Sequence, residues 1–400
     1  MISNRWFILS LLFLARTAMG VQFQTVGSLG PVLVDAFAID YARLAALVGL
    51  YLLPGVVIAW PGGLFVDRIG AKKIALVGLA TMAAGGLLMA AGTSFAMLIA
   101  ARLVSGTGAI LMNVGVTKMV ADWYVGREIR TAMGILVSSW PLGIAVGLIA
   151  FAPLEAVFGW QAVMYAAALL CLVQLPLLAV FYRQPPAAPA QAAPAAMIPL
   201  KPREWRLVLI AGFIWGVYNV GFIVLVSFLP ALFAREGYTL GEATGLVSAL
   251  GWAFILLVPL GGYFADRYRR PDAVMAAGFV VAALASALLP LPQAMMPAFI
   301  VLMLAAGLPA GPIMALPASV LRMQVRGSGT GVYYAWSYAL MATLPALAGL
   351  AQDLTNSAAA PMLFAAAMLV AALIGLAAFR VTLRVCARTP DDVHSSVPVR

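Results

Sequence analysis

The chain has 400 residues, of which 64% are hydrophobic and 10% are charged, and its mean hydropathy is +1.03. Soluble domains are on average about 45–50% apolar and about 25% charged. A soluble enzyme, a disordered protein and a nucleic-acid-binding domain are therefore excluded. The formal net charge of +10 is of the kind that basic loops give a membrane protein. The composition predicts a protein that crosses a membrane several times.

Twelve apolar segments follow one another along the chain, separated by charged or Pro- and Gly-rich stretches. About 20 residues of α-helix cross a bilayer core. The first segment is expected to be an uncleaved helix, because Arg16 and the apolar run after it do not fit a signal peptide. We expect an all-α polytopic fold with twelve transmembrane helices, at residues 7–35, 44–66, 74–91, 96–118, 130–152, 161–182, 206–233, 244–265, 273–291, 297–320, 328–351 and 359–380.

The basic residues predict the orientation of these helices. With the N-terminus in the cytoplasm, 20 of the 24 Lys and Arg residues fall in cytoplasmic segments, and only Arg43 and Arg235 fall in outer loops. This asymmetry predicts a multi-pass protein of the cytoplasmic (inner) membrane with both termini inside. Residues 184–199 are rich in Pro and Ala, as in a flexible linker. The expected parts are a six-helix bundle at 1–183, a cytoplasmic linker at 184–205, a second six-helix bundle at 206–385 and a tail at 386–400.

Residues suited to catalysis are scarce. Cys171 lies in an apolar run, Cys386 lies in the tail, and the single histidine is His394. The sequence contains no metal-binding or nucleotide-binding motif. We therefore expect no enzymatic activity, no cofactor, no nucleic-acid partner and no direct use of ATP.

One short motif occurs twice, 199 residues apart. Each copy places Gly-Gly three residues before Asp-Arg: Gly62, Gly63, Asp67 and Arg68 in the first, and Gly261, Gly262, Asp266 and Arg267 in the second. A weaker similarity links Thr131, near the start of the fifth segment, with Ser328 in the eleventh. Glycines let two helices approach closely, and such an Asp can pair with Arg or face a helix N-terminus. The repeat predicts two six-helix bundles related by pseudo-two-fold symmetry.

The stretch from Gly63 to Lys73 resembles the signature loop of the major facilitator superfamily: Gly, three residues, Asp-Arg, one residue, Gly, then basic residues. The chain departs from this pattern at Ala71, where a basic residue is usual, and the second copy has Arg269 in place of the second Gly. The resemblance implies alternating access, with two bundles that rock around a central site. It also implies gating or conformational roles for Gly63, Asp67, Arg68, Gly70, Gly262, Asp266 and Arg267.

Two arginines, and no acidic residues, lie in the middle of the predicted spans. Charged residues inside a bilayer are expensive and are candidates for function. Arg16 either serves the cavity or extends toward the cytoplasmic interface. Arg102, followed by Gly106 and Gly108, resembles the motif of the family's fourth helix, where the matching Arg is associated with coupling and gating. The alternative is that Arg102 anchors a backbone carbonyl or Asp35.

Polar and aromatic residues recur in the spans expected to line a central cavity, where they can stack on and hydrogen-bond a solute. Tyr218 and Asn219 lie in the seventh span, Trp252 in the eighth, and Tyr334 and Tyr338 in the eleventh. The candidate substrate-binding residues are Arg16, Gln24, Arg102, Asn113, Tyr218, Asn219, Trp252, Tyr334 and Tyr338.

Two arginines without a central carboxylate favour an anionic solute. The leading prediction is a secondary active transporter that moves a small organic or inorganic anion by alternating access. A proton-coupled drug or metabolite efflux antiporter is the alternative, although the fifth span has Trp140-Pro141 where the family's antiporter motif has Gly-Pro. The expected partners are the solute, the lipid bilayer and a coupling proton or counter-solute, and a monomer is expected.

Overall fold

The computed structural model describes residues 4–185 and 198–388. Residues 186–197 of the predicted linker and 389–400 of the predicted tail, with His394, lie outside the described residues. Helices, and no strands, make up the regular structure of the described ranges. Eleven of these helices or helix pairs are long and apolar enough to cross a membrane. The expected all-helical, multi-span membrane fold is confirmed.

Helices of the first half of the chain match six predicted spans. They are α1 (Arg5–Ser28), α2 (Gly30–Phe37), α3 (Tyr41–Leu50), α4 (Pro54–Ile69), α5 (Ala71–Ala90), α6 (Phe95–Tyr124), α7 (Ile129–Phe158) and α8 (Trp160–Phe181). The prediction of one continuous helix at 7–35 is wrong, because the helix is interrupted at Leu29, beside Gly30 and Pro31. The second span is likewise divided between α3 and α4, just before Pro54, since proline has no backbone N–H to donate.

The second half repeats this series. It contains α9 (Pro202–Arg235), α10 (Leu240–Arg267), α11 (Pro271–Leu288), α12 (Met295–Ala305), α13 (Ala310–Val320), the 3₁₀ turn η1 (Met323–Val325), α14 (Arg326–Thr355) and α15 (Ala359–Arg388). The predicted tenth span is interrupted at Ala306–Pro309, between α12 and α13. Several helices exceed the predicted spans: α6, α7 and α14 have 30 residues each, or about 45 Å, against a hydrocarbon core of about 30 Å.

The α14 helix does not count among the apolar spans, although it is 30 residues long. Its first half carries Gly, Ser, Thr and Tyr residues, and these are buried against other helices. The eleven apolar spans expose large apolar side chains on the outside of the protein, such as Leu148, Ile149 and Leu256. An apolar exterior of this kind is what lipid covers.

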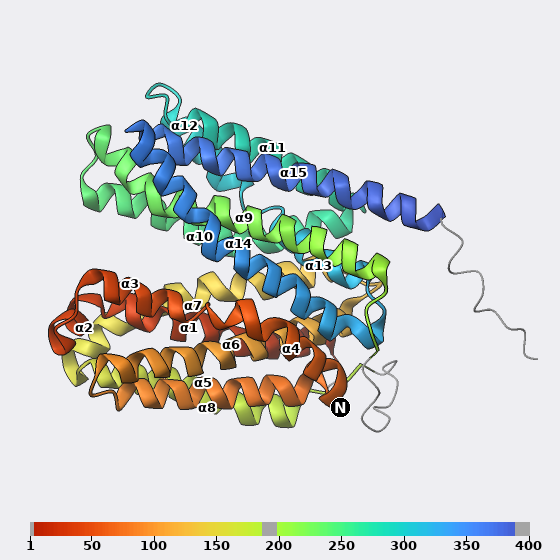
Figure 1. Cartoon of the computed structure of the whole chain (residues 1–400), viewed down its shortest axis with the longest axis horizontal. Coiled ribbons are helices and arrows are strands. Elements are labelled where there is room, and N and C mark those ends of the chain that lie inside the picture. The colour runs from red at the N-terminus through yellow and green to blue at the C-terminus, as the bar shows by residue number, and fades with distance from the viewer. Residues whose placement is uncertain (1–3, 186–197, 389–400) are drawn as a thin grey trace, which may run out of the picture.

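The helices form two bundles (Figure 1). Helices coloured red to yellow lie on one side, and helices coloured green to blue lie on the other. The bundles meet at the end where the N-terminus and the last turns of α15 lie, and their ribbons diverge toward the opposite end. The contacts between bundles are made mainly by α4 on α14 and by α7 on α10. We call the end where the bundles meet the Asp-Arg end, because Asp67-Arg68 and Asp266-Arg267 lie there.

Candidate functional site

The first Asp-Arg turn, at the end of α4, contacts the start of α14. Asp67 Oδ1 accepts a hydrogen bond from the backbone N–H of Gly327 at 2.7 Å, and Oδ2 accepts one from Ser328 N–H at 2.6 Å. These N–H groups belong to the first turn of α14 and have no acceptor within their own helix. The carboxylate therefore caps a helix of the other bundle and interacts favourably with its dipole.

The second Asp-Arg turn, at the end of α10, makes the corresponding contact with α7. Asp266 Oδ2 accepts hydrogen bonds from the backbone N–H of Thr131 at 2.7 Å and from its hydroxyl at 2.8 Å. Asp266 Oδ1 pairs with Arg130 at 3.0 Å. The interpretation that each Asp faces a helix N-terminus agrees with this geometry, and the weak similarity of Thr131 and Ser328 marks the two helix starts that are capped.

Glycines bring the bundles into backbone contact beside each turn. A Cβ atom at Gly63 would overlap the carbonyl oxygen of Gly327, and one at Gly262 would overlap the carbonyl oxygen of Arg130. Gly70 ends α4 with a φ of 106°, which favours glycine. Of the predicted gating residues, Arg68 and Arg267 are exposed, and neither forms an ion pair with a described residue.

A third contact between the bundles at the Asp-Arg end was not foreseen from the sequence. Asp122 on α6 pairs with Arg326 of α14 at 2.9 Å and with Lys118, one turn earlier on its own helix, at 2.6 Å. All three side chains are largely buried. The predicted span ended at residue 118, whereas α6 continues to Tyr124, so Asp122 lies on the helix and faces α14. In the sequence, the i,i+4 spacing of Lys118 and Asp122 was the signal for the pair that these two residues form.

Arg16, on α1, lies inside the protein and is 6% exposed. Its Nε donates to Asn113 Oδ1 at 2.8 Å, and its Nη1 donates to the carbonyls of Leu136 and Val137 and to Ser139 Oγ at 2.8 to 3.1 Å. Nη2 makes no hydrogen bond with a described residue and is not fully buried. The side chain is fixed within the first bundle, so extension toward the membrane surface is excluded.

Tyrosines of α14 face Arg16 from the other bundle. Tyr334 and Tyr338 lie close to its guanidinium, and their rings stack with centroids 5.9 Å apart. The hydroxyl of Tyr334 also hydrogen-bonds to that of Thr117 on α6 at 3.0 Å. Four of the predicted substrate-binding residues, Arg16, Asn113, Tyr334 and Tyr338, therefore come together where the two bundles meet. We call these four residues, together with Thr117 and Ser139, the central cluster. Thr117 and Ser139 were not predicted from the sequence.

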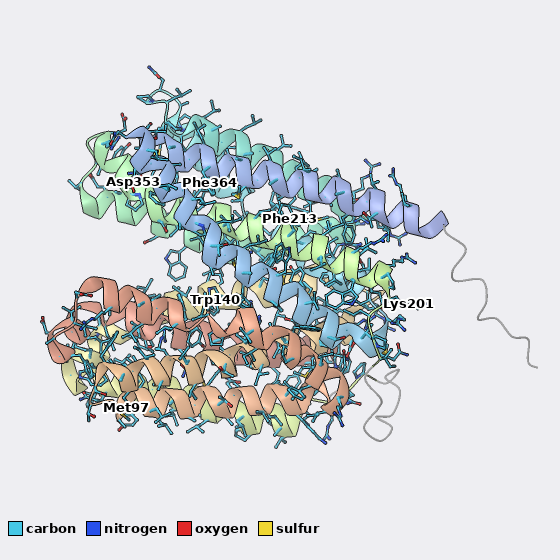
Figure 2. The ribbon with its side chains drawn as sticks, viewed as in Figure 1. Met97, Trp140, Lys201, Phe213, Asp353 and Phe364 are labelled. Atoms are coloured by element: carbon cyan, nitrogen blue, oxygen red, sulfur yellow. The ribbon has the colours of Figure 1, made fainter. Side chains whose placement is uncertain are left out.

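Trp140 lies next to the central cluster and was also missed. It follows Ser139 on α7 and packs on Phe23 with ring centroids 5.0 Å apart. Figure 2 labels Trp140 beside the region where the two bundles begin to diverge. The indole is half-buried and has an amphipathic aromatic surface. A Trp-Pro pair inside an apolar span was its only signal in the sequence.

Arg102 lies apart from the central cluster and is 2% exposed. It donates to three backbone carbonyls, those of Leu47, Gln22 and Phe23, at 3.0 to 3.2 Å. The guanidinium also lies over the ring of Tyr51, 4.7 Å from the centroid. These are the contacts of the backbone-anchor alternative, and they join α6 to α1 and α3.

The remaining predicted residues are not brought into the central cluster by any described hydrogen bond. Tyr218 donates its hydroxyl proton to the carbonyl of Ala306 at 2.6 Å, at the break between α12 and α13. Asn219 bonds to a carbonyl of its own helix, and Gln24 bonds to Ser28 one turn further on. Trp252 is 49% exposed.

Known proteins support the transporter assignment. Residues 12–251 match the family model described as Major Facilitator Superfamily. The chain is 27% identical over 256 residues to the 3-(3-hydroxy-phenyl)propionate transporter of Escherichia coli (strain K12), covering 60% of each protein. It is 24% identical over 302 residues to the 4-hydroxybenzoate transporter PcaK of Pseudomonas aeruginosa, covering 66% of this chain and 67% of that one.

A shorter alignment and a solved structure complete the comparison. Over 121 residues the chain is 29% identical to the quinolone resistance protein NorA of Staphylococcus aureus (strain N315), covering 29% of this chain and 31% of that one. The crystal structure of the human organic anion transporter MFSD10 (TETRAN) superposes with a TM-score of 0.75 at 16% identity, covering 93% and 99% of the two chains. The family model covers more than half of this sequence, and the chain belongs to the major facilitator superfamily of multi-pass membrane transporters.

Proposed function

We propose that this protein is a secondary transporter that moves a small organic anion, and specifically an aromatic carboxylate, by alternating access. The observation that carries the proposal is the geometry of Arg16. Nε and Nη1 of its guanidinium are fixed by Asn113, Ser139 and two carbonyls, whereas Nη2 has no acceptor among the residues that the structure describes. A guanidinium positioned in this way can donate to a carboxylate or phosphate oxygen.

The charges around Arg16 favour an anion over a cation. Its hydrogen-bond partners are all neutral. The carboxylates of Asp67, Asp122 and Asp266 belong to the Asp-Arg end, where other groups engage them. A cationic drug would meet the positive charge of Arg16 with no carboxylate to offset it, which would disfavour binding.

Aromatic side chains support an aromatic solute. Tyr334 and Tyr338 stack on each other close to Arg16, and Trp140 follows Ser139, a hydrogen-bond partner of Arg16, on α7. Rings such as these bind flat solutes by offset stacking while their polar atoms hydrogen-bond substituents. The names of the two transporter relatives described above, which concern a hydroxyphenylpropionate and a hydroxybenzoate, are consistent with a ring that bears both a carboxylate and a hydroxyl.

The direction of opening follows from the contacts between the bundles. The Asp-Arg end is held by both Asp caps and the Asp122 pair. The excess of Lys and Arg makes this end cytoplasmic in our proposal, in a cytoplasmic (inner) membrane with both termini inside. The structure then corresponds to an outward-facing state, and the Asp-Arg turns serve as the cytoplasmic gate. We propose residues 1–183 and 206–385 as the two moving bundles and a monomer as the functional unit.

Uptake by purified protein in liposomes tests the proposal. We expect saturable uptake of ¹⁴C-labelled 4-hydroxybenzoate or 3-(3-hydroxyphenyl)propionate above that of protein-free liposomes. Arg16→Gln should reduce uptake at least about 100-fold, because a charged hydrogen bond to the solute is lost. Arg16→Lys should retain part of the activity. Arg235→Gln, which removes one exposed charge at the opposite end, is the matched control and should match the wild type.

Drug efflux is the second candidate, and the short NorA alignment favours it. Export of ethidium from proteoliposomes, with no effect of Arg16→Gln, would support efflux and contradict the anion proposal. Persistence of anion uptake in the Arg16→Gln protein would also contradict it.

A further inference from the structure

Among the residues that the structure describes, no carboxylate pairs with the positive charge of Arg16. Its hydrogen bonds end on an amide, two carbonyls and a hydroxyl, and Tyr334 and Tyr338 lie close to it. Arginine stays protonated in proteins. The other buried charges behave differently: Arg326 has Asp122, and Arg130 has Asp266. Among the described residues, Arg16 and Arg102 are therefore the two mid-span cations without a carboxylate partner.

Arg102 offsets its charge with three carbonyl dipoles and the face of Tyr51. All of these groups belong to the first bundle, so this arrangement can move as a unit when the bundles rock. The four acceptors of Arg16 also belong to the first bundle, but Arg16 lies where the bundles meet, with Tyr334 and Tyr338 of the second bundle close to it. Its surroundings must change when one side of the protein closes and the other opens.

Alternating access passes through a state in which the site is closed on both sides. In that state the unloaded protein would enclose an unpaired positive charge, which is unfavourable because a buried charge without a partner loses its hydration. A bound carboxylate forms an ion pair with Arg16 and removes the net charge. The loaded protein should therefore change conformation much faster than the unloaded protein.

We infer that this transporter is an anion exchanger, in which entry of one anion is coupled to exit of another. The inference rests on the proposed function, since it requires an anion at Arg16. The inference also concerns the source of energy for transport. The middle of the spans contains no Asp, Glu or His, and these are the residues that commonly carry protons in transporters. A gradient of a second anion, rather than of protons, would drive accumulation.

Counterflow in a chloride-free buffer tests the inference. Liposomes containing the purified protein are either preloaded with unlabelled 4-hydroxybenzoate or left unloaded, and initial uptake of the ¹⁴C-labelled compound is measured. We expect uptake into preloaded liposomes to be at least about tenfold faster, and an inward proton gradient should not raise uptake into unloaded ones. Equal rates, or uptake driven by the proton gradient, would overturn the exchanger inference while leaving the anion proposal intact.

Membrane potential provides a second readout. During net uptake the empty transporter must change from the inward-facing to the outward-facing state, and this change moves the unpaired positive charge of Arg16. The loaded transporter carries no net charge at the site. An inside-positive potassium potential set with valinomycin should therefore accelerate net uptake and leave exchange unchanged. Potential-dependent exchange, with potential-independent net uptake, would contradict the inference. No uptake under either loading, with 4-hydroxybenzoate and 3-(3-hydroxyphenyl)propionate both tried, would overturn the anion proposal and the inference with it.

A substitution next to Arg16 separates a charge effect from a packing effect. Asn113→Asp places a permanent carboxylate at the atom that accepts from Arg16 Nε at 2.8 Å. The unloaded protein then has an internal ion pair, so the ratio of exchange to net uptake should fall toward one, even if both rates decrease. Asn113→Ser, which changes packing without adding charge, should keep the high ratio. A ratio that falls in the Ser variant and stays high in the Asp variant would contradict the inference.

Discussion

The two Asp-Arg turns occupy equivalent places in the two halves but hold the opposite bundle with different chemistry. Asp67 uses each carboxylate oxygen for one backbone N–H of α14. Asp266 uses one oxygen for both donors of Thr131 and the other for the Arg130 side chain. The first contact depends on main-chain geometry, whereas the second depends partly on side chains. The duplicated motif thus conserves the position of the Asp and leaves its partners free to differ.

Among substitutions at the two turns, the largest effect is expected where the backbones touch, because that contact is common to both turns. A methyl group at Gly63 or Gly262 would overlap a main-chain carbonyl of the other bundle. We expect Gly63→Ala and Gly262→Ala each to prevent the Asp-Arg end from closing and to lower initial uptake at least about tenfold, since an overlap with backbone cannot be relieved by a rotamer change. The control is Gly251→Ala, also on α10, where no atom lies within 4 Å and alanine should be neutral or slightly stabilising. Wild-type uptake by both variants would show that this end need not close so tightly.

Neutralising the two aspartates should reveal the difference between the turns. Asparagine keeps one acceptor oxygen. In Asp266→Asn that oxygen can still serve both donors of Thr131, and the loss is confined to a partly exposed ion pair of about 0–1 kcal/mol. In Asp67→Asn one of the two N–H groups must face an NH₂ donor, which costs roughly 1–3 kcal/mol. Thermal unfolding in detergent should give a larger decrease in Tm for Asp67→Asn. A larger decrease for Asp266→Asn would reverse the comparison.

Backbone conformation distinguishes the turns again at the last position of the motif. Gly70 has a φ of 106° and a ψ of 140°, a region open essentially to glycine, whereas Arg269 has a φ of 53°, which other residues tolerate better. We expect Gly70→Ala to destabilise the protein by about 1–3 kcal/mol. Arg269→Gly should change the free energy of unfolding by less than about 1 kcal/mol, because two effects oppose each other. Glycine relieves the strain of the left-handed backbone in the folded state, but it also increases the conformational entropy of the unfolded chain. Equal Tm values for Gly70→Ala and the wild type would contradict the strain argument.

The sequence was sufficient for the features that are encoded locally. Apolar segments predicted the helices, and the repeated motif identified Asp67 and Asp266 before their partners were known. The partners themselves depend on tertiary structure: Arg326 and Asp122 are 204 positions apart. The three carbonyls that engage Arg102 come from α1 and α3, and no residue pattern specifies how these helices lie against α6. Arg16 was singled out because charged residues are rare inside spans, although its hydrogen bond to Asn113, 97 positions away, could not be foreseen.

The smallest effect is expected for the Arg130 side chain, and it tests how much of the second turn is an ion pair. Arg130 is 31% exposed, so solvent screens its attraction to Asp266. Arg130→Gln should lower the free energy of unfolding by less than about 1 kcal/mol, because Asp266 keeps both hydrogen bonds to Thr131. High salt should reduce the difference between this variant and the wild type, measured as Tm in detergent, since screening already removes the same interaction. A loss as large as that of Asp67→Asn would mean that the ion pair, and not the capped N-terminus of α7, holds this side of the Asp-Arg end.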